Sequence, residues 1–438
     1  MKPPRSDRRR FLQGSAAVLG MAAAGVKPAV TQGPKQQTAI LPADVRPLGE
    51  RSPFEKTYRT GSATDGLTPL QDIYGIITPS DLHFYVNHEY GAIPVIDPEK
   101  YRLLIHGAVD RPVMLTLDEI KLLPSVTRVN FIECGGNGNL ERTKVAKTVQ
   151  ETHGRSSCAE WTGVPLSVLL KEVGIKKEGT WAIAVSEDTA NHAISIPMAK
   201  CMEDVLVAYG QNGEPLRLEQ GYPLRLVVPG WTGRIHVKWL NHLKITNQPY
   251  LTTQEDFLPG EGLPFEMTDL GRRRKYETFS KSVITFPSGG HQLTRRGPYE
   301  ISGLAWSGAG RITKVEVSTD DGRTWKTAEL QSPVLPRAFT RFRLPWQWDG
   351  GATVVQSRAT DEIGNVQPTM EAMEKNWFSN PECVDVNAKE CKRIPQRANR
   401  SLVQRWKIAS DGSVQNGFEP TKGILEIGSL IRLDEHNH

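Results

Sequence analysis

The stretch Val129-Asn130-Phe131-Ile132-Glu133-Cys134-Gly135-Gly136-Asn137-Gly138-Asn139 joins a strand-like run to a cysteine and then to three glycines within four residues. Glycine lets a backbone approach a bulky ligand closely or adopt a positive φ. A cysteine at the end of a strand, facing bare backbone, therefore suits a bound metal or cofactor. Free cysteine is also among the most buried residue types, so a packed cysteine before a turn is the competing interpretation.

Length and composition are those of a globular protein of about two or three domains. The 438 residues are 38% hydrophobic and 24% charged, with a net charge of +5 and no long basic run. This balance argues against a dedicated nucleic-acid-binding protein. The cysteines are too scattered for a disulfide framework, and a pairing of Cys383 with Cys391 in an oxidising compartment stays open. No Cys-x-x-Cys-His motif occurs, so we expect no haem in this chain.

The N-terminus predicts export. The run Arg8-Arg9-Arg10-Phe11-Leu12-Gln13 resembles the twin-arginine signal of bacteria, and a small-residue apolar run follows over 14–26. This run is too short to span a bilayer, so residues 1–26 are interpreted as a removed twin-arginine signal peptide and not as a membrane anchor. A basic amphipathic start without targeting function is the alternative. The signal favours a periplasmic cofactor enzyme, and residues 27–72 read as a linker and irregular lead-in.

Residues 73–279 mix strands and helices without a regular βαβ alternation, which predicts an α+β domain. A capping box at Thr116 and Glu119 opens a short helix that Pro124 closes, and residues 165–174 have the apolar spacing of a second helix. Strands are expected at 101–107, 181–185, 225–229 and 237–240.

Residues 280–377 have a different pattern. Short alternating segments at 314–318, 325–328, 341–344 and 353–359 are separated by turn residues, which predicts an antiparallel β-sandwich like an immunoglobulin domain. Residues 378–438 read as an irregular C-terminal tail.

Common catalytic signatures are missing from the sequence. The run Gly136-Asn137-Gly138 is not a dinucleotide fingerprint, because Glu141 stands where the third glycine is needed. Gly-x-x-x-x-Gly-Lys-Ser/Thr, Gly-x-Ser-x-Gly and His-Glu-x-x-His motifs do not occur. The cysteines are not spaced for structural zinc.

Residues 221–239 are the most distinctive stretch of the chain. Two apolar segments carry Arg225, Arg234, His236 and Lys238 around a Pro-Gly-x-x-Gly turn. Cations within apolar segments are costly unless they meet an anion, and a phosphate or acidic ligand fits that need. The alternative is a structural ion-pair network with the acidic neighbours Glu187, Asp188 or Glu219.

Four motifs in this order resemble the sulfite oxidase family of molybdopterin enzymes. The matching segments are Phe84-Tyr85-Val86-Asn87-His88 with 93–98, Cys134-Gly135-Gly136-Asn137, residues 221–238, and residues 311–325. The resemblance implies a sulfite-oxidase-type molybdopterin-binding domain over 73–279 and an immunoglobulin-like β-sandwich dimerisation domain over 280–377.

The resemblance also implies a single pyranopterin cofactor that carries molybdenum. Cys134 stands at the position of the catalytic, metal-binding thiolate, and a soft thiolate suits a sulfur-ligated metal. By position, the cofactor-binding residues are Asn87, His88, Cys134, Ser186, Asp188, Arg225, His236, Val237 and Lys238.

Several positions depart from the pattern of animal and plant sulfite oxidases. Arginines of that pattern are replaced by Val86 and by Gly138-Asn139, and a histidine is replaced by Gln220. The active-site tyrosine has no clear counterpart, and Phe257 and Met267 are the nearest residues. These losses argue against free sulfite as the main substrate.

A sister branch is more similar: the catalytic subunits of sulfane (sulfite) dehydrogenases in bacterial thiosulfate-oxidising (Sox) systems. Residues 133–138, 158–166, 219–225 and 282–290 carry this resemblance, although Val86 departs from it. It implies oxidation of sulfur carried on a partner protein's cysteine and electron transfer to a separate cytochrome. His153 and Arg155 lie between Cys134 and the second helix, where they face either the substrate pocket or solvent.

We therefore expect a periplasmic molybdenum enzyme that oxidises sulfite or protein-bound sulfane sulfur. The expected partners are a second copy bound through the C-terminal domain, a cytochrome c that accepts electrons, and a sulfur-carrier protein as substrate. Three alternatives remain: a molybdopterin sulfoxide reductase, a cofactor-free binding subunit of a sulfur-oxidation complex, and a zinc enzyme.

Overall fold

The computed structural model describes residues 52–62, 64–87, 92–138, 146–188, 191–250, 266–268, 271–273, 277–369 and 402–418. The predicted signal peptide, His88, Phe257, Cys383 and Cys391 lie outside these residues. The chain from Tyr58 onward forms one compact unit. Among the described residues, no helix combines the length and apolar character needed to cross a bilayer.

One sheet of the first domain carries the predicted cysteine at its end. Its strand order is β11 (Glu214–Pro215), β10 (Leu206–Gln211), β7 (Ser156–Pro165) and β6 (Val126–Glu133), and β12 (Arg225–Val227) pairs with β10. β6 and β7 run antiparallel, with Val126 opposite Gly163 and Glu133 opposite Ser156. Phe131 and Trp161 are buried between this sheet and its neighbours, so the end of β6 is held in a packed environment.

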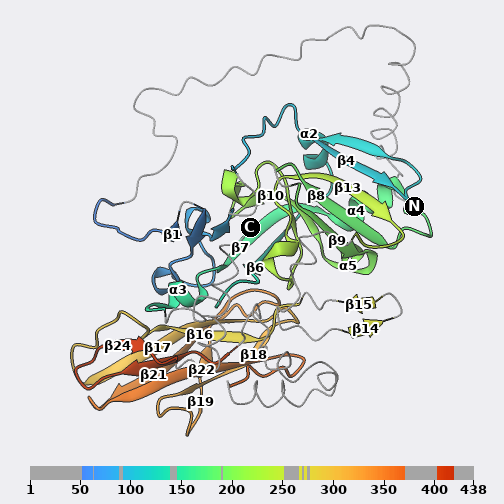
Figure 1. The fold of residues 1–438 in the computed structure, drawn as a ribbon. Coiled ribbons are helices and arrows are strands. Elements are labelled where there is room, and N and C mark those ends of the chain that lie inside the picture. The colour runs from blue at the N-terminus through green and yellow to red at the C-terminus, as the bar shows by residue number, and fades with distance from the viewer. Residues whose placement is uncertain are drawn as a thin grey trace, which may run out of the picture. The chain divides into compact units, whose positions relative to one another are not determined.

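The second sheet of this domain has the order β5 (Val113–Thr116), β4 (Arg102–Gly107), β13 (Leu240–Thr246), β8 (Trp181–Ser186) and β9 (Ala193–Pro197). The strands β13 and β4 are parallel, whereas the other pairs are antiparallel. This mixed topology, seen in Figure 1, confirms the predicted α+β class.

The two predicted helices begin and end at the capping residues that the sequence indicates. The helix α2 (Leu117–Lys121) begins after Thr116, whose side chain and that of Glu119 make the reciprocal bonds of a capping box. The helix α4 (Leu166–Val173) ends before Gly174, which has a φ of 68° and lies against Asp110. Two further helices are α3 (Val149–His153) and α5 (Met198–Glu203).

The predicted strand at 237–240 is wrong for its first three residues. A 3-10 turn, η6 (Gly233–Ile235), is followed by irregular backbone, and Trp239 has a φ of 49°. The strand β13 begins only at Leu240. The indole Nε1 of Trp239 donates to Leu218 O at 3.0 Å, so side-chain and turn contacts override the strand tendency of the apolar residues.

The second domain is a two-sheet sandwich, as predicted. One sheet has the order β16 (Lys281–Phe286), β17 (Gly297–Trp306), β21 (Thr340–Trp348) and β20 (Glu329–Leu330). The other has the order β19 (Lys326–Thr327), β18 (Ile312–Ser318), β22 (Thr353–Asp361), β23 (Arg405–Ile408) and β24 (Val414–Asn416).

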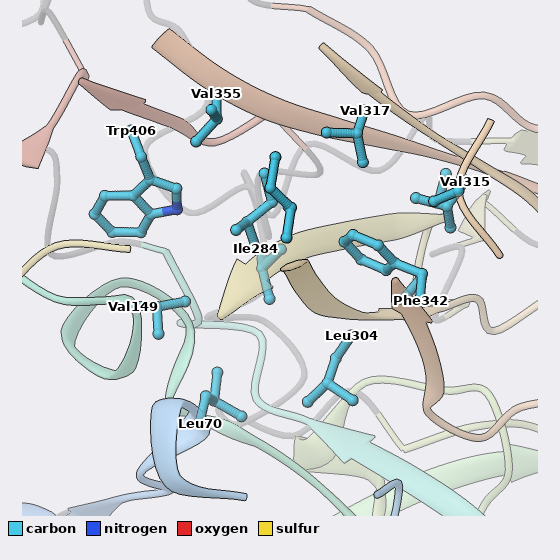
Figure 2. Close-up of a cluster of buried hydrophobic side chains, with 14 of the residues drawn as sticks. Leu70, Val149, Ile284, Leu304, Val315, Val317, Phe342, Val355 and Trp406 are labelled. Atoms are coloured by element: carbon cyan, nitrogen blue, oxygen red, sulfur yellow. The ribbon is translucent and has the colours of Figure 1, made fainter. Parts of the chain in front are cut away.

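The core of this sandwich extends into the first domain (Figure 2). Ile284, Leu304 and Phe342 from one sheet share a buried cluster with Val315, Val317, Val355 and Trp406 of the other sheet. Leu70 and Val149, which precede the sandwich by more than one hundred residues, belong to the same cluster. Apolar burial of this kind is the dominant favourable term in folding, and here it joins the two domains.

Two predicted irregular segments contain strands. In the tail, Arg405-Trp406-Lys407-Ile408 alternates polar and apolar residues, and β23 pairs with β22 so that Trp406 is fully buried. In the lead-in, β1 (Thr60–Ser62) and β2 (Asp65–Leu67) form a small sheet with β3 (Tyr85–Val86). These strands are short, so their sequence signal is weak. The distant pairs β22–β23 and β2–β3 add to the local hairpin of β1 and β2.

The remaining elements are short. The 3-10 turns η2 (Leu70–Asp72), η3 (Ser80–Leu82) and η5 (Leu218–Gln220) lie in the first domain, and β14 (Glu266–Thr268) pairs with β15 (Gly271–Arg273).

A buried ion pair connects the end of β6 to the sandwich. Glu133 and Lys281 are both at most 1% exposed, and the Lys281 Nζ donates to Glu133 Oε1 at 2.6 Å. The same Oε1 accepts from Asn137 Nδ2 at 2.8 Å, and Oε2 accepts from Trp306 Nε1 at 2.8 Å. Both carboxylate oxygens are therefore satisfied without water.

We predict that Lys281→Met lowers the free energy of unfolding by about 3–5 kcal/mol, because it leaves an uncompensated buried carboxylate. The double variant Lys281→Met with Glu133→Gln should lose less than the sum of the single changes. Arg311→Met is the control, since Arg311 pairs with Glu362 at the surface and such pairs contribute about 0–1 kcal/mol. Denaturant unfolding is measured on wild type, Lys281→Met, Glu133→Gln, the double variant and Arg311→Met. Equal losses in Lys281→Met and Arg311→Met would contradict the prediction.

Candidate functional site

Backbone hydrogen bonds fix the loop that follows β6. The amide of Cys134 donates to Arg155 O at 2.9 Å, and the amide of Asn137 donates to Cys134 O at 2.9 Å. The Asn137 side chain donates to Glu133 and accepts from the Arg155 amide at 3.1 Å. One asparagine thus ties the loop to the buried carboxylate on one side and to the start of β7 on the other.

The Cys134 thiol is partly exposed, whereas Cys158 and Cys201 are buried. The amide of Gly136 lies 3.4 Å from Cys134 Sγ. Burial raises the pKa of Cys158 and of Cys201 to about 12, so these two thiols stay protonated and act as packing residues. Among the described cysteines, Cys134 is the one placed to ligate a metal.

The Pro-Gly-x-x-Gly turn packs against the cysteine and against the sandwich. A Cβ added to Gly233 would lie 3.1 Å from Glu133 O and 3.2 Å from the Cα of Cys134. Gly230, with a φ of 79°, faces the backbone of Gly308 at a distance that admits no side chain. The two glycines therefore serve close backbone packing around Cys134.

Three cofactor-binding candidates from distant segments meet in the interior. The Lys238 Nζ donates to Asn87 Oδ1 at 2.6 Å, to Glu219 O at 3.0 Å and to Val86 O at 3.3 Å. Arg225, at the start of β12 and 3% exposed, donates from Nη1 to Gln220 O at 3.0 Å and to Gln220 Oε1 at 3.1 Å.

Aromatic rings and one acidic side chain complete the surroundings of these cations. The Arg225 guanidinium lies 4.9 Å from the ring centroid of Trp161, and Glu219 pairs with Arg59 at 2.8 Å. We call Arg59, Arg225 and Lys238 the cation cluster.

The electrostatics of the cation cluster favour a bound anion. Burial and the charge of Arg225 lower the pKa of Lys238 to about 7, against the opposing charges of Glu219, Asp188 and Cys134. A negatively charged ligand would reverse this shift, because an opposite charge stabilises the protonated amine. Burial likewise lowers the pKa of His83 to about 3, with Arg225, Arg59 and Lys238 adding to the effect.

Both ring nitrogens of His236 lie within hydrogen-bond distance of backbone groups. Its Nδ1 accepts from the Val228 amide at 3.2 Å, and its Nε2 lies 3.0 Å from Trp231 O. Burial and the charge of Arg225 lower the pKa of His236 to about 3, so the imidazole is neutral. Both ring nitrogens thus contact protein groups, and the role of His236 in cofactor binding stays a prediction.

The other predicted site residues have structural contacts. Ser186, the last residue of β8, donates to Asp188 Oδ2 at 2.7 Å and accepts from the Asp188 amide at 3.1 Å. Val237 is fully buried and accepts from the Leu226 amide at 2.8 Å. His153 is buried beside Thr152, with burial holding its pKa well below the usual value, so it does not face solvent.

The residues present fit an anionic pterin cofactor. Asn87 Nδ2 is buried and has no hydrogen-bond partner among the described residues, and such an orphaned donor costs about 1–3 kcal/mol. It belongs to the side chain that accepts from Lys238, next to the cation cluster. A ligand with phosphate or carbonyl oxygens would satisfy this donor, and the Cys134 thiol offers the sulfur that a soft metal prefers.

Sequence reasoning missed two residues that shape this site. Gln220 was interpreted only as a lost histidine, yet its side chain accepts from Arg225 and donates to Phe84 O at 2.9 Å. His83 stacks edge-on against Trp161, and its Nε2 is buried without a partner in the described part of the chain. Gln220 lies within the matched segment 219–225, five residues before Arg225, and His83 lies four residues before Asn87, outside the matched segments.

Comparison with known proteins identifies two family models. The model for the oxidoreductase molybdopterin binding domain matches residues 90–254, and the model for the Mo-co oxidoreductase dimerisation domain matches residues 272–380. Together they cover most of the α+β domain and of the sandwich, without β1–β3 and without β23 and β24.

Among similar proteins, mitochondrial sulfite oxidase of Drosophila melanogaster is 31% identical over 79% of this chain and 62% of its own length. NADH nitrate reductase 2 of Phaseolus vulgaris is 32% identical over 71% of this chain and 40% of its own length. The chain thus spans less than two thirds of these relatives. The crystal structure of the sulfane dehydrogenase SoxCD from Paracoccus pantotrophus matches with a TM-score of 0.75 and 36% identity, covering 90% of this chain and 100% of that one.

We predict that uptake of molybdopterin by the cofactor-free protein weakens by about tenfold per pH unit above pH 7. The lowered pKa of Lys238 means that its charged form, which attracts the anion, is lost as pH rises through about 7. Lys238→Arg should flatten this dependence, because guanidinium stays protonated. Bound pterin and molybdenum are measured across the pH series, and parallel losses in both proteins would rule out Lys238 as the titrating group.

Proposed function

The chain belongs to the sulfite oxidase family of molybdopterin oxidoreductases, and we propose that it oxidises an anionic reduced sulfur compound in the periplasm. Its substrate is sulfite or sulfane sulfur carried on a partner protein, and its electrons pass to a cytochrome c. The observation that carries this proposal is the partly exposed Cys134 at the end of β6, in a loop that hydrogen bonds to Arg155 O and to the buried Glu133 carboxylate hold in place.

Similarity over the full length of a sulfane dehydrogenase structure supports the substrate class. The dimerisation-domain match supports a homodimer formed through the sandwich. The twin-arginine-like start supports export.

The protein residues have separate tasks in this proposal. When bound, the molybdenum-pterin group supplies oxygen-transfer and two-electron redox chemistry. Cys134 would give the metal its protein sulfur ligand, while Arg225, Lys238 and Asn87 would hold the anionic end of the pterin. Glu133 and Asn137 keep the cysteine loop in one conformation. For sulfite, the reaction takes one oxygen from water and releases two electrons and two protons with sulfate.

A reductase is the second candidate, because a nitrate reductase is among the relatives with 32% identity. Purified protein should therefore be tested for oxidation of sulfite and of protein-bound sulfane sulfur, and for reduction of nitrate and methionine sulfoxide. Faster reduction than oxidation would replace the proposed function.

Metal analysis tests the remaining alternatives. Protein exported with cofactor supply should contain molybdenum and a fluorescent pterin. Molybdenum-free protein would indicate a binding subunit, and stoichiometric zinc without pterin would indicate a zinc enzyme.

We predict that Cys134→Ser loses activity by more than about 100-fold, which exceeds the usual effect of changing residues behind a metal ligand. Molybdenum should be retained or only partly lost, because the pterin also holds the metal. Cys201→Ser is the control, since that thiol is buried away from the loop. Elemental analysis and turnover are measured on the same samples. An active Cys134→Ser protein would exclude the thiol as the catalytic ligand.

A further inference from the structure

Arg155 lies directly across from Cys134. The antiparallel ladder of β6 and β7 ends with Glu133 opposite Ser156. The bond from the Cys134 amide to Arg155 O at 2.9 Å continues this ladder by one more pair. Residues directly opposite each other in antiparallel strands project on the same face, with Cβ atoms about 4.5–5.5 Å apart. The side chains of Cys134 and Arg155 therefore start from opposing backbone positions at the end of the sheet.

Asp65 forms an ion pair with the Arg155 guanidinium but leaves one of its N–H donors without a hydrogen bond among the described residues. Arg155 Nη2 pairs with Asp65 Oδ2, and the two side chains are 21% and 18% exposed. The contact is end-on, and Arg155 Nε and Asp65 Oδ1 are buried with no hydrogen-bond partner among the described residues. A second acceptor at Arg155 Nε would satisfy the donor, which is how guanidinium commonly recognises an oxyanion.

The charge at this position acts on Cys134 directly. Burial alone would lower the pKa of Arg155, but the Cys134 thiolate and the Asp65 carboxylate together raise it above its usual value. Lys238 also interacts with Cys134, yet its ammonium already donates to Asn87, Glu219 and Val86. Arg155, by contrast, keeps a buried donor, Nε, without a partner among the described residues.

We propose that Arg155, anchored by Asp65, binds the anionic group of the sulfur substrate beside Cys134. This inference rests on the proposed function and narrows it to substrates with a negatively charged oxygen or sulfur terminus. The backbone bonds of residue 155 do not depend on its side chain, so substitution should leave the cysteine loop intact.

The test compares molybdenum-loaded wild type with Arg155→Met, Arg155→Lys and Arg343→Met. Arg343 is the matched control, since it also pairs end-on with one carboxylate, that of Glu300, in the sandwich. Sodium sulfate is the probe for binding, followed by calorimetry at constant ionic strength, because it is an oxyanion that undergoes no turnover. Steady-state kinetics with sulfite and molybdenum content are measured on the same preparations.

Arg155→Met should weaken sulfate binding and raise the KM for sulfite by roughly ten- to a hundred-fold, the effect of losing one charge-assisted hydrogen bond. Its kcat and molybdenum content should stay near those of wild type. Arg155→Lys should regain part of the affinity, and Arg343→Met should behave as wild type.

Unchanged sulfate binding in Arg155→Met, or a fall in kcat at constant KM, would overturn the assignment. A second outcome separates the two claims. If wild-type protein oxidises no sulfur anion but binds sulfate in a way that depends on Arg155, the proposed reaction is wrong and the anion site is confirmed.

Discussion

The buried pair of Glu133 and Lys281 is the interaction on which the site depends. Taking two charges out of water is costly unless each is paired and hydrogen-bonded, and here Asn137 and Trp306 supply the additional bonds. Because Glu133 precedes Cys134, the pair fixes the cysteine loop to the sandwich. The shared apolar cluster that includes Leu70, Val149 and Ile284 works in the same direction. The sandwich is thus part of the support of the site as well as a separate domain.

The interior beside this loop carries more positive charge than a stable apolar core normally accepts. Arg225 donates to neutral oxygens of Gln220, and Lys238 does so to oxygens of Asn87, Val86 and Glu219. Burial lowers the pKa of His83 and of Lys238, and the positive charge of Arg225 adds to the shift in both. A bound anion would offset the repulsion between these cations. This is the physical reason for interpreting the cation cluster as a cofactor site.

Much of the fold could be predicted from local signals. The capping box at Thr116, the glycine at 174 and the period-two segments of the sandwich each identify an element through contacts made within a few residues. The strand at 405–408 was not predicted because its partner β22 lies far away in sequence. The hairpin at 60–67 was not predicted because each of its strands is only three residues long. The irregular backbone before Leu240 was not predicted. There, side-chain hydrogen bonds from Trp239 to Leu218 O and between His236 and Trp231 O outweigh the strand preference of the apolar residues.

The sequence by itself determined the family and the molybdopterin class of cofactor, because these follow from residue types at fixed spacing. It also predicts Cys134 as the metal ligand. Tertiary structure decided which side chains meet. The Asn87 side chain accepts a hydrogen bond from Lys238, and the Gln220 side chain accepts one from Arg225. The His236 ring accepts from the Val228 amide, and the Arg155 carbonyl accepts from the Cys134 amide. Such pairings depend on strand register and on the burial of individual donors and acceptors, which are properties of the packed chain and not of its local sequence.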